Sequence, residues 1–223
     1  LLILVSVTLV IVSCSTKKNN FVNRKYHNTT AKYNGYFNGN ERLKAGIKKL
    51  EENHKDDFSE IIPVFKTGDL AKNQTIHPYM NKAIEKGSIV IQRHSMNIRG
   101  KEHNKWIDDN YFMIGKAYFY KGEFDEAIKT FNYIKETYKR NPLKYDAALW
   151  LARCFSEKED YVAAEMELDQ LQTDRKFPDK LDDELAVILA DFYLKQENYI
   201  LALDELNTAI KRIKKRKKKT RPY

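Results

Sequence analysis

Residues 108–134 read DDNYFMIGKAYFYKGEFDEAIKTFNYI, and the same pattern of residue types occurs twice more in the chain. The second copy is YDAALWLARCFSEKEDYVAAEMELDQL at residues 145–171, and the third is DELAVILADFYLKQENYILALDELNTA at residues 183–209. Each copy has a large apolar residue, then a small residue, then an aromatic residue three positions further on. These residues are Ile114, Gly115 and Tyr118, then Leu151, Ala152 and Phe155, then Leu189, Ala190 and Tyr193. Self-similarity at a fixed period predicts a repeat architecture.

The second half of each copy repeats as well. An aromatic residue is followed three positions later by an alanine and seven positions later by an apolar residue. The sets are Phe124, Ala127 and Phe131, then Tyr161, Ala164 and Leu168, then Tyr199, Ala202 and Leu206. This pattern resembles the tetratricopeptide repeat, a helix–turn–helix unit in which small residues let two helices approach closely. We therefore predict an all-α fold, a right-handed α-solenoid of tetratricopeptide-like helical hairpins, with three repeats over residues 108–216.

Turn and capping residues fit the same interpretation. Pro142 and Pro178 lie in the linkers between repeats, where a helix must end. Asp108 or Asp109 is expected to cap the first helix, and Gly122 is expected to end it.

Residues 14–107 are predicted to form a less regular N-terminal helical region. Residues 27–53 suggest a further, degenerate hairpin, because Tyr33, Tyr36, Ala45 and Lys49 fall near the key positions of the repeat. Residues 54–75 are expected to form a loop broken by Pro63 and Gly68, and residues 78–96 a single long helix.

The N-terminal end predicts a lipid anchor. Residues 1–13 are apolar apart from small hydroxyl side chains, and they are shorter than the ~20 residues that span a bilayer. They fit a residual lipoprotein signal peptide. With Ser13 and the aliphatic residues before it, this end resembles a bacterial lipobox, and the resemblance implies that Cys14 receives a diacylglyceryl group and becomes the mature N-terminus. The alternative is an uncleaved, truncated membrane helix in which the cysteine is incidental.

Apart from the acyl chains on Cys14, no cofactor is expected. Acylation would leave Cys154 as the remaining cysteine, so no intrachain disulfide is predicted. A buried structural thiol is the expected role of Cys154.

The C-terminal end carries the net charge. Residues 211–221 contain nine basic residues and no acidic one, while the whole chain has 40 basic and 31 acidic residues. Without those nine the balance is 31 to 31, so the formal charge of +9 lies in this segment. The run could bind nucleic acid or anionic lipid, but an exported protein would not meet the genome, so no nucleic-acid partner is expected. A solvated helix end is the other interpretation. Residues 217–223 are expected to be a basic junction to a further repeat.

No catalytic constellation is present in the sequence. It lacks a glycine-rich phosphate loop, the G-x-S-x-G and H-E-x-x-H motifs, and a paired-cysteine motif. The histidines are scattered without the spacing of metal ligands, so no metal site is predicted; they are His27, His54, His77, His94 and His103. We expect a binding protein and not an enzyme.

Repeat solenoids bind partners along the concave face formed by the first helix of each pair. Aligning the repeats predicts the partner-binding residues on that face, which are Phe112, Lys116, Phe119, Leu149, Arg153, Val187 and Asp191. Exposed aromatic residues beside a lysine and an arginine would suit an extended peptide or a partner helix. Packing of Phe112, Phe119 and Leu149 between repeats is the alternative.

Longer stretches resemble the SprE/PorW lipoproteins of the gliding motility and type IX secretion machinery of Bacteroidetes. They are CSTKKNNFVNRKYHNTTAKYNGYFNGNERLKAGIKKL at residues 14–50, IIPVF at 61–65, KAIEKGSIVIQRHSM at 82–96 and the KKRKKK junction at 214–219. The resemblance implies an outer-membrane lipoprotein that faces the periplasm and joins the inner-membrane motor module to outer-membrane components. Members of this family are longer than this chain and have no catalytic residues.

Together, the repeats and the resemblance predict a non-enzymatic scaffold or adaptor that contacts envelope proteins of this machinery. Two alternatives remain open at the level of sequence. One is a periplasmic binding module for glycan or an anionic surface. The other is the docking arm of a larger enzyme.

Overall fold

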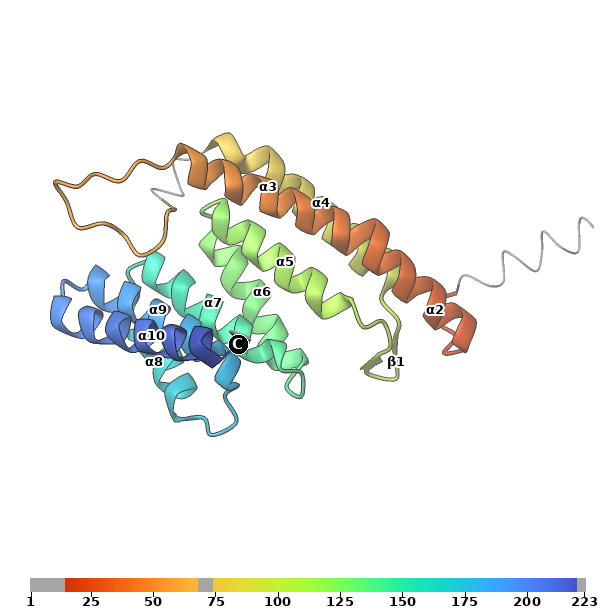
Figure 1. The fold of residues 1–223 in the computed structure, drawn as a ribbon. Helices are drawn as coiled ribbons and strands as arrows, with labels where there is room; N and C mark the ends of the chain where they lie inside the picture. Colours follow the sequence, from red (N-terminus) through yellow and green to blue (C-terminus); the bar gives the residue numbers. More distant parts are fainter. Residues whose placement is uncertain (1–14, 68–73, 220–223) are drawn as a thin grey trace, which may run out of the picture.

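The computed structural model describes residues 15–67 and 74–219, and its side chains as far as residue 214. Helices dominate the described residues (Figure 1). They are α2 (Phe21–Thr30), the π-helix η1 (Ala31–Phe37), α3 (Asn38–Asn53), α4 (His77–His94), α5 (Ile107–Tyr120), α6 (Phe124–Thr137), α7 (Leu143–Glu157), α8 (Tyr161–Thr173), α9 (Asp182–Lys195) and α10 (Tyr199–Lys219). Short 3₁₀ turns are η2 (Gln74–Ile76) and η3 (Asp179–Leu181), and β1 (Asn97–Ile98) pairs with β2 (Lys101–Glu102) in an antiparallel hairpin.

Successive helices pack against one another along the chain. The helices pack in pairs as hairpins, which are α3–α4, α5–α6, α7–α8 and α9–α10. Contacts of α4 with α5 and of α6 with α7 join one hairpin to the next. The first helices also contact each other, α3 with α5, α5 with α7, and α7 with α9. Figure 1 shows this stacking from the α3–α4 arm to the α9–α10 end. The predicted all-α solenoid of helical hairpins is therefore confirmed.

The turn inside each hairpin has the same backbone geometry. Gly122, Glu159 and Glu197 adopt left-handed conformations with φ of 76°, 59° and 59°. In each case the next residue donates its backbone N–H to the carbonyl of the repeat's aromatic residue, at 2.9–3.0 Å, in the pairs Glu123–Tyr118, Asp160–Phe155 and Asn198–Tyr193. Gly122 thus ends the first helix as predicted. The capping prediction was wrong, because α5 already begins at Ile107 and both aspartates lie in its first turn.

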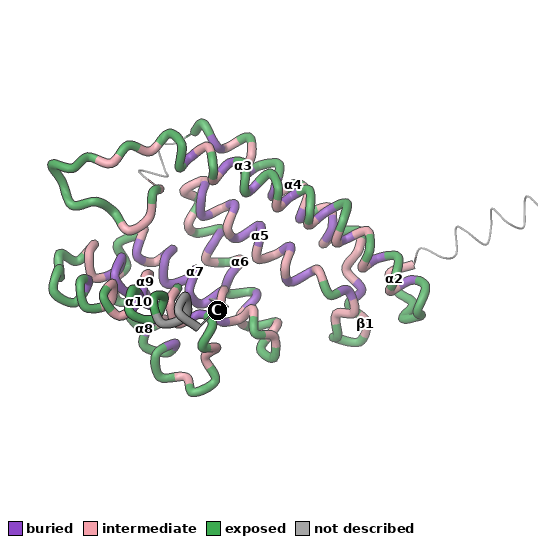
Figure 2. The backbone as a smooth tube through the Cα atoms, viewed as in Figure 1, coloured by how far each residue is buried: buried purple, intermediate pink, exposed green. Residues whose placement is uncertain are grey.

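The small residues of the repeat lie where the two helices of a hairpin meet. A Cβ atom at Gly115 would be 2.7 Å from Cε1 of Phe131, whose ring is fully buried. In the second repeat Ala152 and Leu168 take these positions and belong to one buried cluster. Figure 2 shows buried and intermediate residues along α5 and α7, which lie between other helices, and exposed residues along the outer side of α3 and α4.

The N-terminal region differs from the predicted hairpin. α2, η1 and α3 follow one another without a break, so a single long helical segment runs from Phe21 to Asn53. Gly35 within this segment allows close packing: a Cβ at this position would lie 1.7 Å from Cγ2 of Val90 on α4. The predicted long helix is confirmed as α4, and the described residues 54–67 contain no helix or strand, in agreement with the predicted loop.

Candidate partner-binding surface

Charged side chains from three helices converge on one face of the repeats. Lys116 lies on α5, Asp146 and Arg153 lie on α7, and Glu184 lies on α9. They are electrostatically coupled, because the pKa of Glu184 responds to the other three. We call this surface the inner face and define it by these four residues and Asp109.

The inner face carries a row of carboxylates. Asp109, Asp146 and Glu184 occupy the same position in the three repeats, 37 and then 38 residues apart. Partial burial, together with the charges of Asp108 and Asp146, raises the pKa of Asp109 to about 6. Burial is also the main cause that raises the pKa of Asp146 and of Glu184. We call these three residues the acid row.

Basic residues lie seven positions after the acid row in the first two repeats, and seven residues are about two helical turns. Burial lowers the pKa of the Lys116 ammonium, and the charge of Arg153 contributes to this lowering. Within the part of the chain that the structure describes, no ion pair joins Lys116 or Arg153 to the acid row. The nearby Lys195 is instead paired with Glu157 at 2.7 Å and Asp191 at 3.3 Å.

Aromatic rings surround Arg153. Its guanidinium carbon lies 4.3 Å from the ring centre of Trp150 and 4.7 Å from that of Phe119. A third ring, that of Phe65, lies 4.0 Å away and comes from the loop between α3 and α4. Such cation–π contacts stabilise a guanidinium that has lost most of its water. In Figure 1 the described part of this loop leaves α3 and returns beside α7.

The loop reaches the inner face through apolar contacts. Phe65 packs against the buried cluster of α7, α8 and α9. Among the described residues, the side-chain hydrogen bonds and ion pairs of 55–67 stay within 54–67, from Asp56 to His54 and Lys66 and from Ser59 to Asp57. The inner face thus already accommodates one aromatic side chain of a non-helical segment.

The structure brings some of the predicted binding residues together. Lys116 and Arg153 flank the Trp150 ring, with the Lys116 ammonium 5.0 Å from the ring centre. Phe112 is half-buried beside the same ring. Val187 is half-buried on α9.

Other predicted residues are not available to a partner. Phe119 and Leu149 have no exposed surface, so they pack between repeats, which was the alternative for these positions. Arg153 and Asp191 are also buried. The ring of Phe65 lies against Arg153, and Asp191 pairs with Lys195. Cys14 lies outside the described residues. Cys154 is a buried free thiol, as predicted.

Sequence reasoning missed the acid row and Phe65. The repeat alignment that selected Lys116 and Arg153 could have found the acid row, because its members repeat with the same spacing. They looked like ordinary first-turn charges of helices. Phe65 carries no such signal, because its contact with Arg153 joins segments that are far apart in the sequence.

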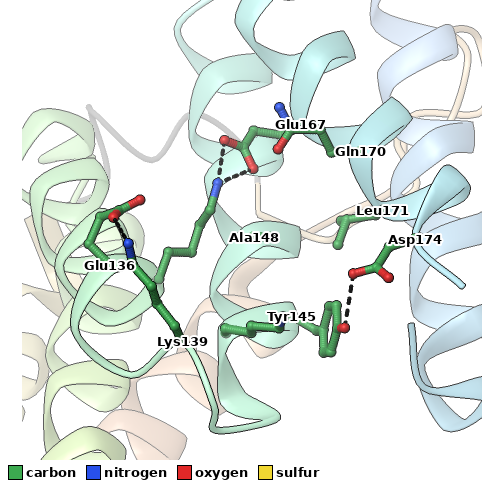
Figure 3. A pocket seen from close by; sticks show the side chains of 10 residues that line it. Glu136, Lys139, Tyr145, Ala148, Glu167, Gln170, Leu171 and Asp174 are labelled. Carbon is green, nitrogen blue, oxygen red and sulfur yellow. Dashed lines mark hydrogen bonds and ion pairs between the residues drawn. The ribbon is translucent and has the colours of Figure 1, made fainter. Parts of the chain in front are cut away.

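A hollow of about 350 Å³ lies between α6, α7 and α8, outside the inner face (Figure 3). Its charged groups bind each other: the Lys135 ammonium donates to both Glu167 oxygens at 2.6 Å, and Lys139 pairs with Glu136 at 2.9 Å. The Tyr145 hydroxyl donates to Asp174 at 2.9 Å. The contact of Lys135 with Glu167 ties the first repeat to the second, so we assign this hollow to the packing of the solenoid.

Metal binding and membrane spanning are two further possibilities for the described residues. No group of three potential metal ligands occurs in the described ranges, 15–67 and 74–219. None of the helices that could be searched there is both long enough and apolar enough to cross a membrane. No protein-family model matches the chain, and no curated protein matches it significantly.

Proposed function

We propose that this protein is a non-enzymatic adaptor that holds an extended, basic segment of a partner protein along the inner face of its repeats. The observation that carries the proposal is the acid row. Three carboxylates from successive repeats are electrostatically coupled, since Asp146 influences both Asp109 and Glu184. Asp109 and Asp146 are partly buried without an ion-paired cation in the described part of the chain, which costs folding free energy. A basic partner would neutralise them and recover that cost.

The distance between neighbouring helices predicts the spacing of basic residues along the partner segment. Neighbouring packed helices lie about 8–10 Å apart, and an extended chain rises about 3.3 Å per residue. A basic residue at about every third position would therefore meet Asp109, Asp146 and Glu184 in turn. Acidic residues between these basic residues of the partner would pair with Lys116.

The first experiment uses fluorescent peptides. A peptide of repeated Lys-Ser-Ser units should bind the full chain more tightly than a peptide of the same composition with its lysines in one block. Asp146→Lys should weaken binding of the spaced peptide by about five-fold or more, since it removes a charge pair that contributes up to about 1 kcal/mol and adds a lysine that repels the peptide. The matched control is Glu165→Lys on the exposed side of α8, which should bind like the wild type. Equal binding of both peptides, or no effect of Asp146→Lys, would refute the proposal.

A second experiment identifies the partner in cells. A photo-reactive phenylalanine analogue at Val187, on α9, should cross-link a partner in intact cells. The same analogue at Met166, which is exposed on α8, is the control. Cross-links that form only at Met166 would place the binding surface elsewhere.

The proposed partners are envelope proteins of the type IX secretion and gliding machinery, and the proposed location is the periplasmic side of the outer membrane. The resemblance of residues 14–50 to the SprE/PorW lipoproteins supports this, together with the lipobox at Cys14. Metabolic labelling with radioactive palmitate should label the wild-type chain and not Cys14→Ala. Secretion components should co-purify with the wild type. Labelling of Cys14→Ala, or recovery of soluble enzymes alone, would contradict this location.

Binding of an anionic surface or glycan is a second candidate. The basic segment continues α10, where Lys211, Arg212 and Lys214 are exposed. Binding through this segment would fall steeply between low and moderate salt. A charge-reversed Lys211→Glu/Lys214→Glu variant should lose it, and should keep binding of the spaced peptide to the inner face.

A further inference from the structure

A second surface lies at the opposite end of the described chain, on the helical segment formed by α2 and η1. Its exposed large side chains are Phe21 (70% exposed), Val22 (60%), Tyr26 (45%), Tyr33 (56%) and Phe37 (56%). We call these five residues the aromatic stripe. So many exposed apolar side chains on one short segment call for a partner.

The aromatic stripe occupies one side of the helix. The opposite side faces α4 and carries the buried residues, which are Asn23, His27, Ala31 and Gly35. At 3.6 residues per turn, Val22 and Tyr26 lie about one turn apart on the same side. Tyr33 and Phe37 continue this side along η1. In Figure 1 α2 lies at the far end of the arm, away from α7–α10.

The segment around the aromatic stripe carries charge of a single sign. Residues 15–40 contain five basic residues and no acidic one. The basic residues are Lys17, Lys18, Arg24, Lys25 and Lys32. Lys17, Lys18 and Lys25 are exposed, and the Lys32 ammonium lies 5.0 Å from the ring centre of Tyr33.

We propose that the aromatic stripe lies in the headgroup region of an anionic phospholipid membrane. Tyrosine rings combine an apolar body with a polar tip and are enriched at this level of a bilayer. Lysines beside them are attracted to anionic headgroups. Only one side of the helix is apolar, so the helix lies in the plane of the membrane surface and does not cross it.

A partner helix is the competing occupant. Grooves that receive a helix present mostly aliphatic pockets, and an acidic partner would be needed for these lysines. Two of the five stripe residues, Tyr26 and Tyr33, instead carry hydroxyl groups, which suit the polar headgroup region.

This inference uses a face that the proposed partner-binding function does not use. An acyl chain on Cys14 would strengthen membrane contact, because only residues 15–20 separate that residue from α2. Six residues of extended chain span at most about 20 Å. The aromatic and cationic side chains would act whether or not Cys14 is acylated.

The test places a tryptophan in the stripe of the full-length chain, as Phe37→Trp. Vesicles contain equal parts of phosphatidylcholine and phosphatidylglycerol, with bromine on the acyl chains. We expect the added tryptophan to lose fluorescence and to shift its emission to the blue when it meets these vesicles. Because the apolar residues 1–13 can also hold the chain on a vesicle, the readout is the depth of this one position and not binding of the whole chain.

The matched control is Met166→Trp on α8, which is exposed and remote from the stripe. Its fluorescence should stay unquenched on the same vesicles. A Lys18→Glu/Lys25→Glu change in the Phe37→Trp chain should remove most of the quenching, whereas Arg175→Glu/Lys176→Glu should not. Circular dichroism checks that each variant keeps its helices.

Several results would overturn the proposal. One is an unquenched Phe37→Trp on a chain that floats with the vesicles. Another is equal quenching of Phe37→Trp and Met166→Trp, which would indicate unspecific contact. Equal quenching on vesicles of pure phosphatidylcholine would show that charge attraction does not contribute to membrane contact. None of these results bears on the peptide assay of the inner face, so the two proposals fail separately.

Discussion

At the scale of single residues, the turns of the second and third repeats hold a strained backbone conformation. Gly122, Glu159 and Glu197 share a left-handed conformation, which costs an L-residue roughly 1–2 kcal/mol and a glycine little. The two glutamates are exposed, so their side chains contribute little in return. The repeat therefore requires a backbone conformation, and glycine meets this requirement in only one copy.

We expect Glu159→Gly and Glu197→Gly each to raise the free energy of unfolding by about 1 kcal/mol, because the strain disappears. Urea unfolding of the full chain measures this change. Gly122→Ala should lower stability by a similar amount, and Glu165→Gly, inside α8, should lower it by about 1 kcal/mol through helix propensity. A destabilised Glu159→Gly would show that the turn is not strained.

Cys154 illustrates burial of a reactive group. The thiol is fully buried, and burial raises its pKa to about 12. Only the thiolate reacts with disulfide reagents, so in a Cys14→Ser chain Cys154 should stay unlabelled at pH 8 until denaturant unfolds the protein. The control adds an exposed thiol on α4, as Ser88→Cys, which should label at once. Rapid labelling of native Cys154 would mean that α7 opens easily.

At the scale of helices, the small residue of each repeat is matched to the apolar residue that it contacts. Gly115 faces the Phe131 ring, whereas the second repeat pairs Ala152 with Leu168. The smaller of the two small residues, glycine, is paired with the larger of the two apolar side chains, phenylalanine. The volume of the pair, and not either residue alone, determines how closely the hairpin closes.

This pairing predicts a coupled pair of substitutions. Gly115→Ala should destabilise the protein by about 1–3 kcal/mol, because the buried ring has no room to move. The double variant Gly115→Ala/Phe131→Leu, which copies the second repeat, should recover much of that loss. A double-mutant cycle in urea measures the coupling, which should be about 0.5–3 kcal/mol between contacting residues. Strict additivity would mean that the backbone yields instead.

Helix-scale packing also explains what the sequence could predict. The hairpins of 108–216 were predictable because each of their signals is local and occurs three times. The N-terminal hairpin was mispredicted because it rested on a few residues of a single, degenerate copy, whereas the structure has one continuous helical segment there. A single copy offers no second occurrence against which its pattern can be checked. The contact of Phe65 with Arg153 was equally out of reach, since it depends on how the loop folds back over the stacked helices.

At the scale of the whole molecule, the acid row links stability to binding. Its carboxylates come from three repeats, so each is close to the next only when the solenoid has assembled. Burial raises the pKa values of all three, and the charge of Asp146 also raises those of Asp109 and Glu184. The folded chain therefore holds protons that the unfolded chain releases, and part of its stability is given up at neutral pH for a charged surface.

The sign of the resulting pH dependence follows directly. Asp109 has a folded pKa of about 6 against an ordinary value of 3.8, so between these values the folded state binds more protons. Stability should then fall as the pH rises from about 4 to 6. Asp109→Asn should remove only the part of this fall that Asp109 causes, because the raised pKa values of Asp146 and Glu184 contribute as well. It should raise stability at pH 7 by about 1–2 kcal/mol. Asp125→Asn is a control of opposite sign, because the Lys158 ion pair lowers the pKa of Asp125 and its small contribution is lost as the pH falls.

Binding should show the complementary dependence. A basic segment favours the ionised acid row, so its affinity for the wild-type chain should increase as the pH rises through about 6, where Asp109 loses its proton. Titrating the spaced lysine peptide between pH 4 and 7 measures this increase, and Asp109→Asn should flatten it. If affinity stays constant while stability changes with pH as expected, the acid row titrates as the structure implies but does not meet the peptide. In that case the cost of these buried charges would have to be explained by another ligand of the inner face.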